Sequence, residues 1–186
     1  MVRAITEEEK LRCLDFATQI IRGNDQYNRF GQDEQVQIDR TYIGKLAEYA
    51  FYHLLIERGV EYELGNMFEI YEGAENADEF DFITANDETV DIKTASLPFH
   101  SRIMVPIDQY RLRKDFYVGI KLNFIGVEGR TIDPMNIESC RLCGYTTRAV
   151  LDLRPTEFFG EGNCKAISLN QLDEIEQLLN RFEVEA

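Results

Sequence analysis

The sequence has few cysteines, no long apolar run and far fewer basic residues than acidic ones. Four cysteines in 186 residues fit reduced thiols better than a disulfide framework. No apolar run approaches the roughly 18 residues that a membrane helix needs. The opening residues lead into a run of glutamates rather than the apolar segment of a secretory signal. We therefore expect a soluble, cytoplasmic protein that does not enter a membrane.

The charge is strongly acidic but unevenly spread. The net charge of −14 argues against a general nucleic-acid binder, because contacts with phosphates usually leave a basic footprint. Residues 93–148, however, hold nine Lys and Arg and only five Asp and Glu, a net charge of +4. The rest of the chain then carries −18. The composition is therefore compatible with one local surface for an anionic ligand.

The apolar content predicts a folded protein. Hydrophobic residues make up 44% of the chain, which includes 12 Phe and 9 Tyr. A chain of 186 residues can bury a full core in one domain and is short for two. We expect a single domain over residues 1–186.

Two helices are predicted before residue 60. Thr6 and Glu9 fit a capping box, and apolar residues then recur at helical spacing through Arg22. Residues 23–37 are polar and carry turn signals, so we expect a connecting loop there. A second amphipathic pattern over about residues 39–58 predicts a long helix.

The remainder reads mainly as strands, with short helices between them. Strands are expected at 60–64, 67–71, 102–105, 116–124, 137–147 and 166–167, with a polar turn after the second of them. Short helices are expected at 108–114 and 149–153, and Ser168 with Gln171 should cap a final amphipathic helix. The run 116–124 is nearly continuously apolar and aromatic, which is typical of a central strand covered on both faces. This order predicts a mixed α/β layer structure.

One stretch, which begins at Asp81 and ends at Lys93, combines acids with a lysine. It reads as two short strands joined by a polar turn. Because strand side chains alternate, Asp91 and Lys93 should share one face while Val90 and Ile92 point to the other. Asp81 on the neighbouring strand would add a second carboxylate. Mg²⁺ favours one or two carboxylates, with water and substrate phosphate at its other positions.

The register of this hairpin decides whether the two acids meet. A two-residue turn at Asn86 and Asp87 would place Phe82, and not Asp81, across from Asp91. A site therefore needs a three-residue loop or a bulge, which Asn and Asp support by adopting left-handed backbone conformations. The alternative is a solvent-exposed acidic hairpin without a site.

Glu48 lies at the border of the apolar stripe of the second predicted helix. A carboxylate there is partly desolvated unless it is paired or bound to a metal. Gly44, one turn earlier, weakens a helix by about 1 kcal/mol relative to Ala, which suggests that something packs closely there. From spacing alone, an exposed border glutamate is the favoured interpretation.

Taken in order, these motifs resemble the PD-(D/E)XK nuclease superfamily, which has the restriction-endonuclease-like fold. The matching segments are Gly44-Lys-Leu-Ala-Glu48-Tyr-Ala-Phe51, Asp81-Phe82, Val90-Asp91-Ile92-Lys93-Thr94 and Lys114-Asp-Phe-Tyr-Val-Gly-Ile120. The resemblance implies an α/β fold whose mixed β-sheet is flanked by helices, with an αβββαβ core over about residues 40–122. Residues 1–39 would be an N-terminal helical extension, and residues 123–186 a C-terminal extension of strands and a helix.

The resemblance also implies a role for each site residue. Asp81 looks like the first metal-binding acid, although it lacks the preceding proline of the motif's name. Asp91 looks like the second, with Asp in place of the more frequent Glu. Lys93 looks like the lysine that activates the attacking water and steadies the phosphorane. Glu48 resembles a helix-borne glutamate that reaches the metal directly or through water, and the backbone carbonyl of Ile92 would be a further ligand.

The function implied is Mg²⁺-dependent hydrolysis of DNA phosphodiester bonds, with Mn²⁺ able to substitute. We expect endonucleolytic cleavage in restriction, defence or repair, and cutting both strands would favour a homodimer. A rival of another class is a non-catalytic module that keeps the fold for binding a partner, which the acidic composition fits.

Basic residues follow the predicted site in the sequence. Arg102, Arg111, Arg113 and Lys114 are candidates for contacts with DNA phosphates. The alternative for the last three is a solvated helix face.

Cys140 and Cys143 have the spacing of half a zinc knuckle. A structural zinc site needs four ligands, and no second CxxC is present. We favour buried cysteines in a strand.

Overall fold

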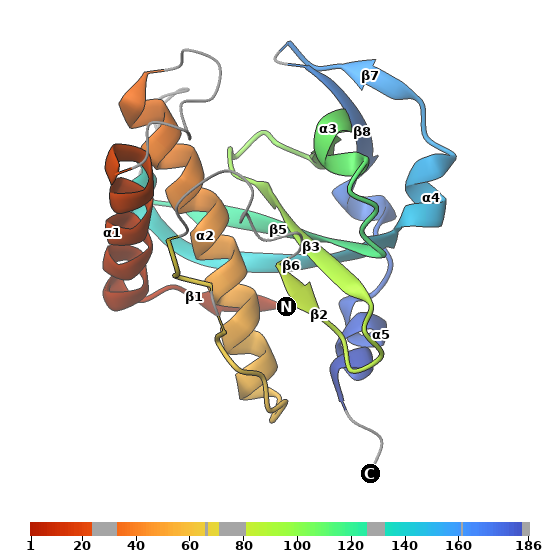
Figure 1. The fold of residues 1–186 in the computed structure, drawn as a ribbon, viewed down its shortest axis with the longest axis horizontal. Helices are drawn as coiled ribbons and strands as arrows, with labels where there is room; N and C mark the ends of the chain where they lie inside the picture. The colour runs from red at the N-terminus through yellow and green to blue at the C-terminus, as the bar shows by residue number, and fades with distance from the viewer. Residues whose placement is uncertain (24–32, 66, 71–80, 126–132, 161, 184–186) are drawn as a thin grey trace.

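The computed structural model describes residues 1–23, 33–65, 67–70, 81–125, 133–160 and 162–183. These residues form a mixed α/β structure, as the sequence predicts, with helices on both sides of a mixed sheet (Figure 1). In this described part of the chain, no helix is both long enough and apolar enough to cross a membrane.

The elements follow one another with short helices between the strands. In chain order they are β1 (Val2–Ala4), α1 (Glu7–Gly23), α2 (Glu34–Glu57), β2 (Phe82–Ile83), β3 (Thr89–Ala95), β4 (Arg102–Pro106), α3 (Ile107–Tyr110), β5 (Phe116–Phe124), η3 (Pro134–Asn136), β6 (Ile137–Thr147), α4 (Arg148–Asp152), β7 (Thr156–Phe158), β8 (Asn163–Ser168), η4 (Leu169–Gln171), α5 (Ile175–Leu179) and η5 (Asn180–Phe182). The strands form a five-stranded sheet in the order β1-β6-β5-β3-β2 and a three-stranded sheet in the order β4-β8-β7.

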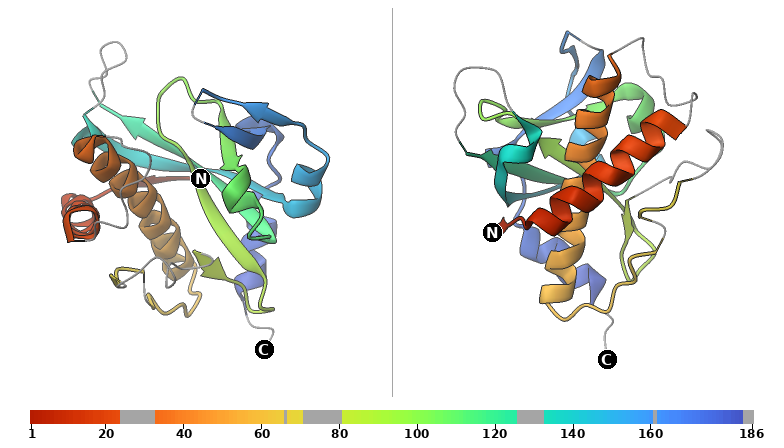
Figure 2. Two further views of the ribbon diagram at one scale, coloured as in Figure 1. Left: turned by 45° about the horizontal axis from the view of Figure 1, so that its top comes forward. Right: turned by 90° about the vertical axis from the view of Figure 1, so that its left-hand side faces the viewer.

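The larger sheet separates two hydrophobic cores. On one face, β3 and β5 pack against α2, with Val90, Ile92 and Val118 in the core. On the other face, Tyr117 of β5 packs against Ile103 of β4 and other apolar residues of the smaller sheet. Figures 1 and 2 show α1 and α2 on one side of the larger sheet and the smaller sheet on the other. The central, doubly covered position predicted for 116–124 is confirmed.

The segment after α2 differs from the prediction. Residues 60–64 and 67–70 form turns and irregular structure instead of the two predicted strands. Tyr62 accepts a hydrogen bond from the backbone N–H of Ile83, at 2.9 Å through its hydroxyl, and so covers the outer edge of β2. Val60 and Met67 are buried without a backbone ladder, and Ile70 is 40% exposed. Periodicity in the sequence does not distinguish this packing from that of a strand. Residue 71 and the predicted polar turn after it lie outside the described residues.

Several helix boundaries also differ. The second helix begins at Glu34, after the N-cap Asp33 accepts a hydrogen bond from the Gln35 N–H at 2.9 Å, so the predicted loop is shorter than 23–37. Much of that loop lies outside the described residues. The helix predicted at 108–114 is the shorter α3. Ser168 makes no side-chain capping bond, and α5 begins only at Ile175 because η4 intervenes.

Gly144, at a register irregularity within β6, allows a close approach of two backbones. Its φ is +138°, and a Cβ there would lie 2.3 Å from the carbonyl oxygen of Asp173. The Tyr145 N–H donates to that same oxygen at 3.1 Å, so the C-terminal segment docks on β6 through this point.

Replacing Gly144 with Ala should therefore destabilise the protein by roughly 3 kcal/mol or more, because strain at positive φ adds to a backbone clash. Gly160→Ala is the matched control. Gly160 also has a positive φ, of +82°, but a Cβ there would meet no atom of the described residues within 4 Å. Its cost should be about 1–2 kcal/mol. Urea unfolding of both variants checks this, and equal losses would contradict the close approach.

Candidate active site

The β2–β3 hairpin has the register that a two-acid site requires. Phe82 pairs with Val90 and Ile83 with Thr89, which places Asp81 opposite Asp91. The chain turns through a three-residue loop, with the Thr84 N–H donating to the Glu88 carbonyl at 2.9 Å. Asp87 closes the loop in the left-handed region at a φ of 61°. Of the two alternatives that the site requires, a three-residue loop or a bulge, the structure has the three-residue loop.

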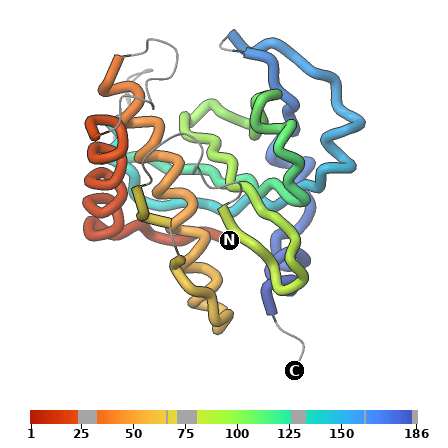
Figure 3. The backbone as a smooth tube through the Cα atoms, in the orientation of Figure 1, coloured from red at the N-terminus to blue at the C-terminus, as the bar shows by residue number. Residues whose placement is uncertain are grey.

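The C-terminal segment holds the tip of this hairpin in place. The guanidinium of Arg181 donates to both carboxylate oxygens of Glu88, at 2.7 and 2.9 Å. The Ala85 N–H donates to the Arg181 carbonyl at 3.0 Å. Figure 3 shows the C-terminal segment beside the hairpin. Nothing in the hairpin sequence indicates this contact with a residue 93 positions away.

The two faces of β3 carry different chemistry, as predicted. Val90 and Ile92 belong to the core under α2. Asp91 and Lys93 pair in register with Tyr117 and Gly119 of the parallel strand β5, so they lie on the opposite face, toward the smaller sheet.

Lys93 is held by two oxygen acceptors. Its ammonium lies 2.7 Å from Asp91 Oδ2 and donates to Gln109 Oε1 at 3.1 Å. The side chains of Asp91 and Lys93 are 13% and 15% exposed. The ion pair is thus well shielded while part of it remains accessible. Gln109, from α3, was not predicted, because a single glutamine in a short helix carries no pattern of its own.

Asp81 directly precedes the first residue of β2, the strand at the edge of the larger sheet. Its Oδ2 accepts the backbone N–H of Ile92 at 2.6 Å, so the carboxylate continues the hydrogen bonding of β3 where β2 begins. The N–H and C=O of one strand residue point to the same side of the strand. The Ile92 carbonyl therefore faces the same edge as Asp81.

Glu48 approaches from α2, on the other face of the sheet. Its side chain is 18% exposed and lies 2.5 Å from the ammonium of Lys45. The interpretation favoured by spacing alone, an exposed glutamate, is therefore wrong. The close packing expected at Gly44 is also absent, since a Cβ there would meet no described atom within 4 Å.

The negative charges of Glu48 and Asp91 make ionisation of Asp81 less favourable. Burial of its carboxylate, followed by repulsion from Glu48 and then from Asp91, raises the pKa of Asp81 well above its usual value. Attraction by Lys93 and the hydrogen bond from Ile92 oppose this rise without cancelling it. Negative charge is thus unfavourable at Asp81, and a cation bound there would relieve the repulsion.

The chemical type of the available ligands fits a hard divalent cation. Asp81, Asp91, Glu48 and the Ile92 carbonyl offer oxygen ligands, the type that Mg²⁺ prefers. Among the described residues, no three acidic, His or Cys side chains are grouped closely enough to hold a metal as they stand. Asp91 and Glu48 each engage a lysine instead. A cation would therefore compete with Lys93 and Lys45 for these carboxylates.

The basic residues are not equally accessible. Arg102, Arg111 and Arg113 are exposed, and Arg111 lies 3.9 Å from Asp108. Lys114 is only 5% exposed. It therefore does not present its charge on the surface, as the phosphate contact predicted for it would require.

The half zinc knuckle lies within β6. Cys140 is buried, Cys143 is half-buried, and both thiols are free. The favoured interpretation, buried strand cysteines, thus holds fully only for Cys140.

Comparisons were made with protein-family models, curated proteins and solved structures, and none of them matches this chain. Its chemistry has to be inferred from its own side chains.

The repulsion at Asp81 predicts that Asp81→Asn stabilises the protein in a chelating buffer at pH 8. The amide oxygen can still accept the Ile92 N–H, while the unfavourable charge is gone. Because the folded-state pKa of Asp81 is raised, the charge weakens the fold as pH rises through that pKa, and the advantage of Asn should vanish at low pH. A rise in melting temperature of about 2–4 °C is expected. The control is Asp87→Asn, in the exposed loop, and a lower melting temperature for Asp81→Asn would refute the repulsion.

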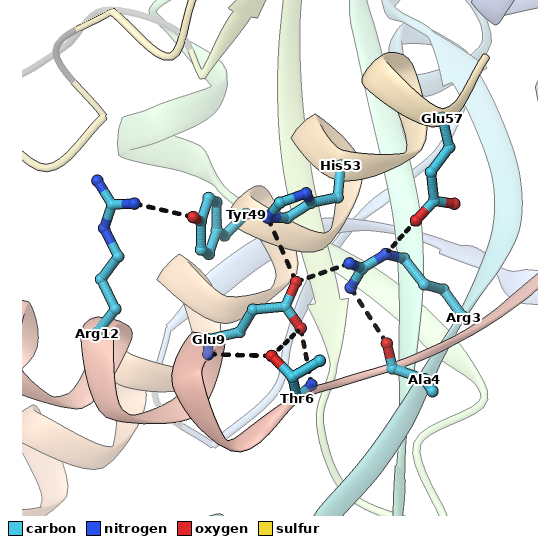
Figure 4. Close-up of polar contacts among 8 residues, drawn as sticks. All are labelled: Arg3, Ala4, Thr6, Glu9, Arg12, Tyr49, His53 and Glu57. Carbon is cyan, nitrogen blue, oxygen red and sulfur yellow. Dashed lines mark hydrogen bonds and ion pairs between the residues drawn. The ribbon is translucent and has the colours of Figure 1, made fainter. Parts of the chain in front are cut away.

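A second buried polar cluster joins β1, α1 and α2 (Figure 4). Glu9, only 6% exposed, accepts hydrogen bonds from the Arg3 guanidinium and the Thr6 N–H, both at 2.7 Å. His53 Nε2 lies 3.3 Å from the same carboxylate, and Arg3 also donates to Glu57 at 3.1 Å. The Glu9 N–H donates to the Thr6 hydroxyl, which confirms the predicted capping box. These charges satisfy one another, so the cluster is an anchor for the N-terminal strand.

Burial alone would raise the pKa of Glu9, but the hydrogen bonds from Arg3 and Thr6 outweigh it and the pKa is lowered. Glu9→Gln should cost about 3 kcal/mol near neutral pH, the usual loss when one partner of a buried ion pair is removed. The gap from wild type should shrink as pH falls through the lowered pKa, since Glu9 is then protonated.

Glu57→Gln is the control for this variant, because Glu57 shares the Arg3 guanidinium but has a 56% exposed side chain. It should cost less than about 1 kcal/mol. Chemical unfolding of the three proteins across pH measures both effects. A pH-independent gap for Glu9→Gln would rule out the ion pair as its cause.

Proposed function

We propose that this protein is a Mg²⁺-dependent nuclease that hydrolyses DNA phosphodiester bonds endonucleolytically, in restriction, defence or repair. The observation that carries the proposal is the hairpin that sets Asp81 opposite Asp91 and holds Lys93 2.7 Å from Asp91. Two carboxylates and a lysine, carried by neighbouring strands and partly shielded from water, are groups that can stabilise the charges that develop during phosphodiester hydrolysis.

Each residue has a role in this proposal. Asp81, Asp91 and the Ile92 carbonyl would hold the metal, with Glu48 assisting from α2. When bound, Mg²⁺ would polarise the phosphate and lower the pKa of a coordinated water. Lys93 would orient the attacking water and stabilise negative charge on the phosphorane. Gln109 would keep the Lys93 ammonium in place through its hydrogen bond at 3.1 Å.

The order of elements supports the finer fold proposal, a restriction-endonuclease-like core. The order α2, β2, β3, β4, α3, β5 has the αβββαβ form that the motifs imply. The strand that follows α3, β5, lies parallel to β3 and beside it, and the basic residues Arg111, Arg113 and Lys114 lie between α3 and β5 and not within the helix. One feature differs: β4 pairs with β8 in the smaller sheet and not with β3.

Contacts with DNA phosphates are proposed for Arg102, Arg111 and Arg113, which are exposed after the active strand. The chain's net charge of −14 would confine DNA to this region by repelling it elsewhere. Affinity should then fall steeply with salt. A homodimer would let two sites cut both strands.

The alternative is a non-catalytic binding module. The pairing of Asp91 and Glu48 with lysines favours it, since carboxylates that are already neutralised have less need of a cation. A titration with Mn²⁺ followed by calorimetry separates the two, because a non-catalytic module should show no metal site.

The nuclease proposal predicts that wild-type protein cleaves plasmid, junction or single-stranded DNA with Mg²⁺ or Mn²⁺. Lys93→Ala, Asp81→Asn and Asp91→Asn should each lower the rate by about a hundred-fold or more, as expected when charge stabilisation of the transition state is lost. Asp87→Asn, in the same hairpin, should keep full activity. Circular dichroism would establish that all variants are folded. Undiminished cleavage by Lys93→Ala would refute the assignment.

A further inference from the structure

The connection between β3 and β4, residues 96–101, holds an exposed aromatic ring directly after the strand that carries Lys93. Phe99 is 61% exposed, so most of its ring is open to solvent. The neighbouring ring of His100 stands nearly perpendicular to it, at 86° with the centroids 5.1 Å apart. A single exposed apolar side chain is ordinary on a protein surface. The exposure of Phe99 gains meaning only from how its backbone is held and from the charge around it.

The backbone on both sides of Phe99 is pinned by a lysine from the larger sheet. Lys121 of β5 donates to the carbonyl oxygens of Leu97, of Pro98 at 3.0 Å and of His100 at 2.7 Å. The loop also closes on itself, because the His100 N–H donates to the Leu97 carbonyl at 2.9 Å. The ring is therefore presented from a fixed backbone, which lowers the entropy lost when it binds a partner.

The charge around the loop favours an anionic partner. The 16 residues from Ile92 to Ile107 contain no Asp or Glu, although the chain has 34 such residues in 186. Of the two cations in this stretch, Lys93 is paired with Asp91 at 2.7 Å, whereas Arg102, which follows the loop, is exposed. A phosphate that approaches this loop thus meets the exposed Arg102 and no acidic side chain from the stretch itself.

We propose that Phe99 is a stacking platform for an unpaired base of single-stranded DNA bound next to the proposed active site. Phosphates supply the negative charge that the acid-free stretch accepts, and a splayed base supplies the flat apolar surface that an exposed ring can stack on. Bases inside a duplex are already stacked on their neighbours, so the platform discriminates for single-stranded or branched DNA. This inference rests on the proposed function for the choice of DNA as ligand.

The test is binding to a short fluorescent DNA strand and to the duplex of the same sequence, in a chelating buffer so that no cleavage occurs. Phe99→Ala should weaken binding to the single strand about ten-fold and leave duplex binding nearly unchanged, in line with the loss of one stacked base. Phe99→Tyr keeps an aromatic face and should bind as wild type does.

Phe158→Ala is the matched control, because Phe158 is a 69% exposed phenylalanine on β7, in the smaller sheet. It should leave binding unchanged. A strand with 2-aminopurine in place of adenine reports stacking directly. Its fluorescence should be quenched by wild type and by Phe158→Ala, and not by Phe99→Ala.

Three results would overturn the inference: no binding of the single strand, equal losses for Phe99→Ala and Phe158→Ala, or equal losses on strand and duplex. Cleavage of the single strand with Mg²⁺ is scored separately on the wild type, Lys93→Ala and Phe99→Ala. Cleavage that needs Lys93 but not Phe99 would leave the nuclease proposal standing and exclude the platform. Stacking that needs Phe99, without any cleavage, would leave the platform standing and exclude the nuclease proposal.

Discussion

The alternation of side chains along β3 is the constraint on which the candidate site depends. One face of the strand contributes Val90 and Ile92 to the core under α2, so the strand cannot slip by one residue without exposing them. The same restriction sends Asp91 and Lys93 to the other face. The hydrophobic core therefore sets the position of the polar pair, and the three-residue loop that ends at Asp87 extends this registry to Asp81.

The electrostatics of Asp81, Asp91 and Lys93 show that these charges add little to the stability of the fold. An ion pair shielded to the degree of Asp91 and Lys93 contributes little net stability, because desolvation offsets most of the attraction. Asp81 lies near two like charges and is disfavoured as an anion. Apolar residues of similar size would be at least as stable here. The charges at this site are thus better explained by a function than by the stability of the fold. Glu9, by contrast, has a lowered pKa, because hydrogen bonds from Arg3 and Thr6 favour its charged form.

Local patterns predicted the parts of the structure whose stability comes from local rules. The capping box at Thr6, the apolar run of β5 and the alternation of β3 each follow from one element's own residues. The segment 60–64 misled because its alternation of apolar and acidic residues is typical of a strand. The structure instead buries Val60 in irregular backbone and places the Tyr62 hydroxyl against the Ile83 N–H of β2. The contacts of Gln109 and Arg181 with the site depend on elements brought together by the tertiary fold, and neither residue type marks such a role in sequence.

Glu48 shows where a pattern and its environment diverge. Its spacing placed it at the border of an apolar stripe, where solvent exposure is the common outcome, yet Lys45 one turn earlier draws it into an ion pair. Because Glu48 and Asp91 occupy opposite faces of the sheet, a single ion can engage both only at the sheet edge, where Asp81 lies. Because Asp81 lies at this edge, it would join Glu48 of α2 and Asp91 of β3 into a single site. Lys45 and Lys93 would then act as counterions that a metal has to displace.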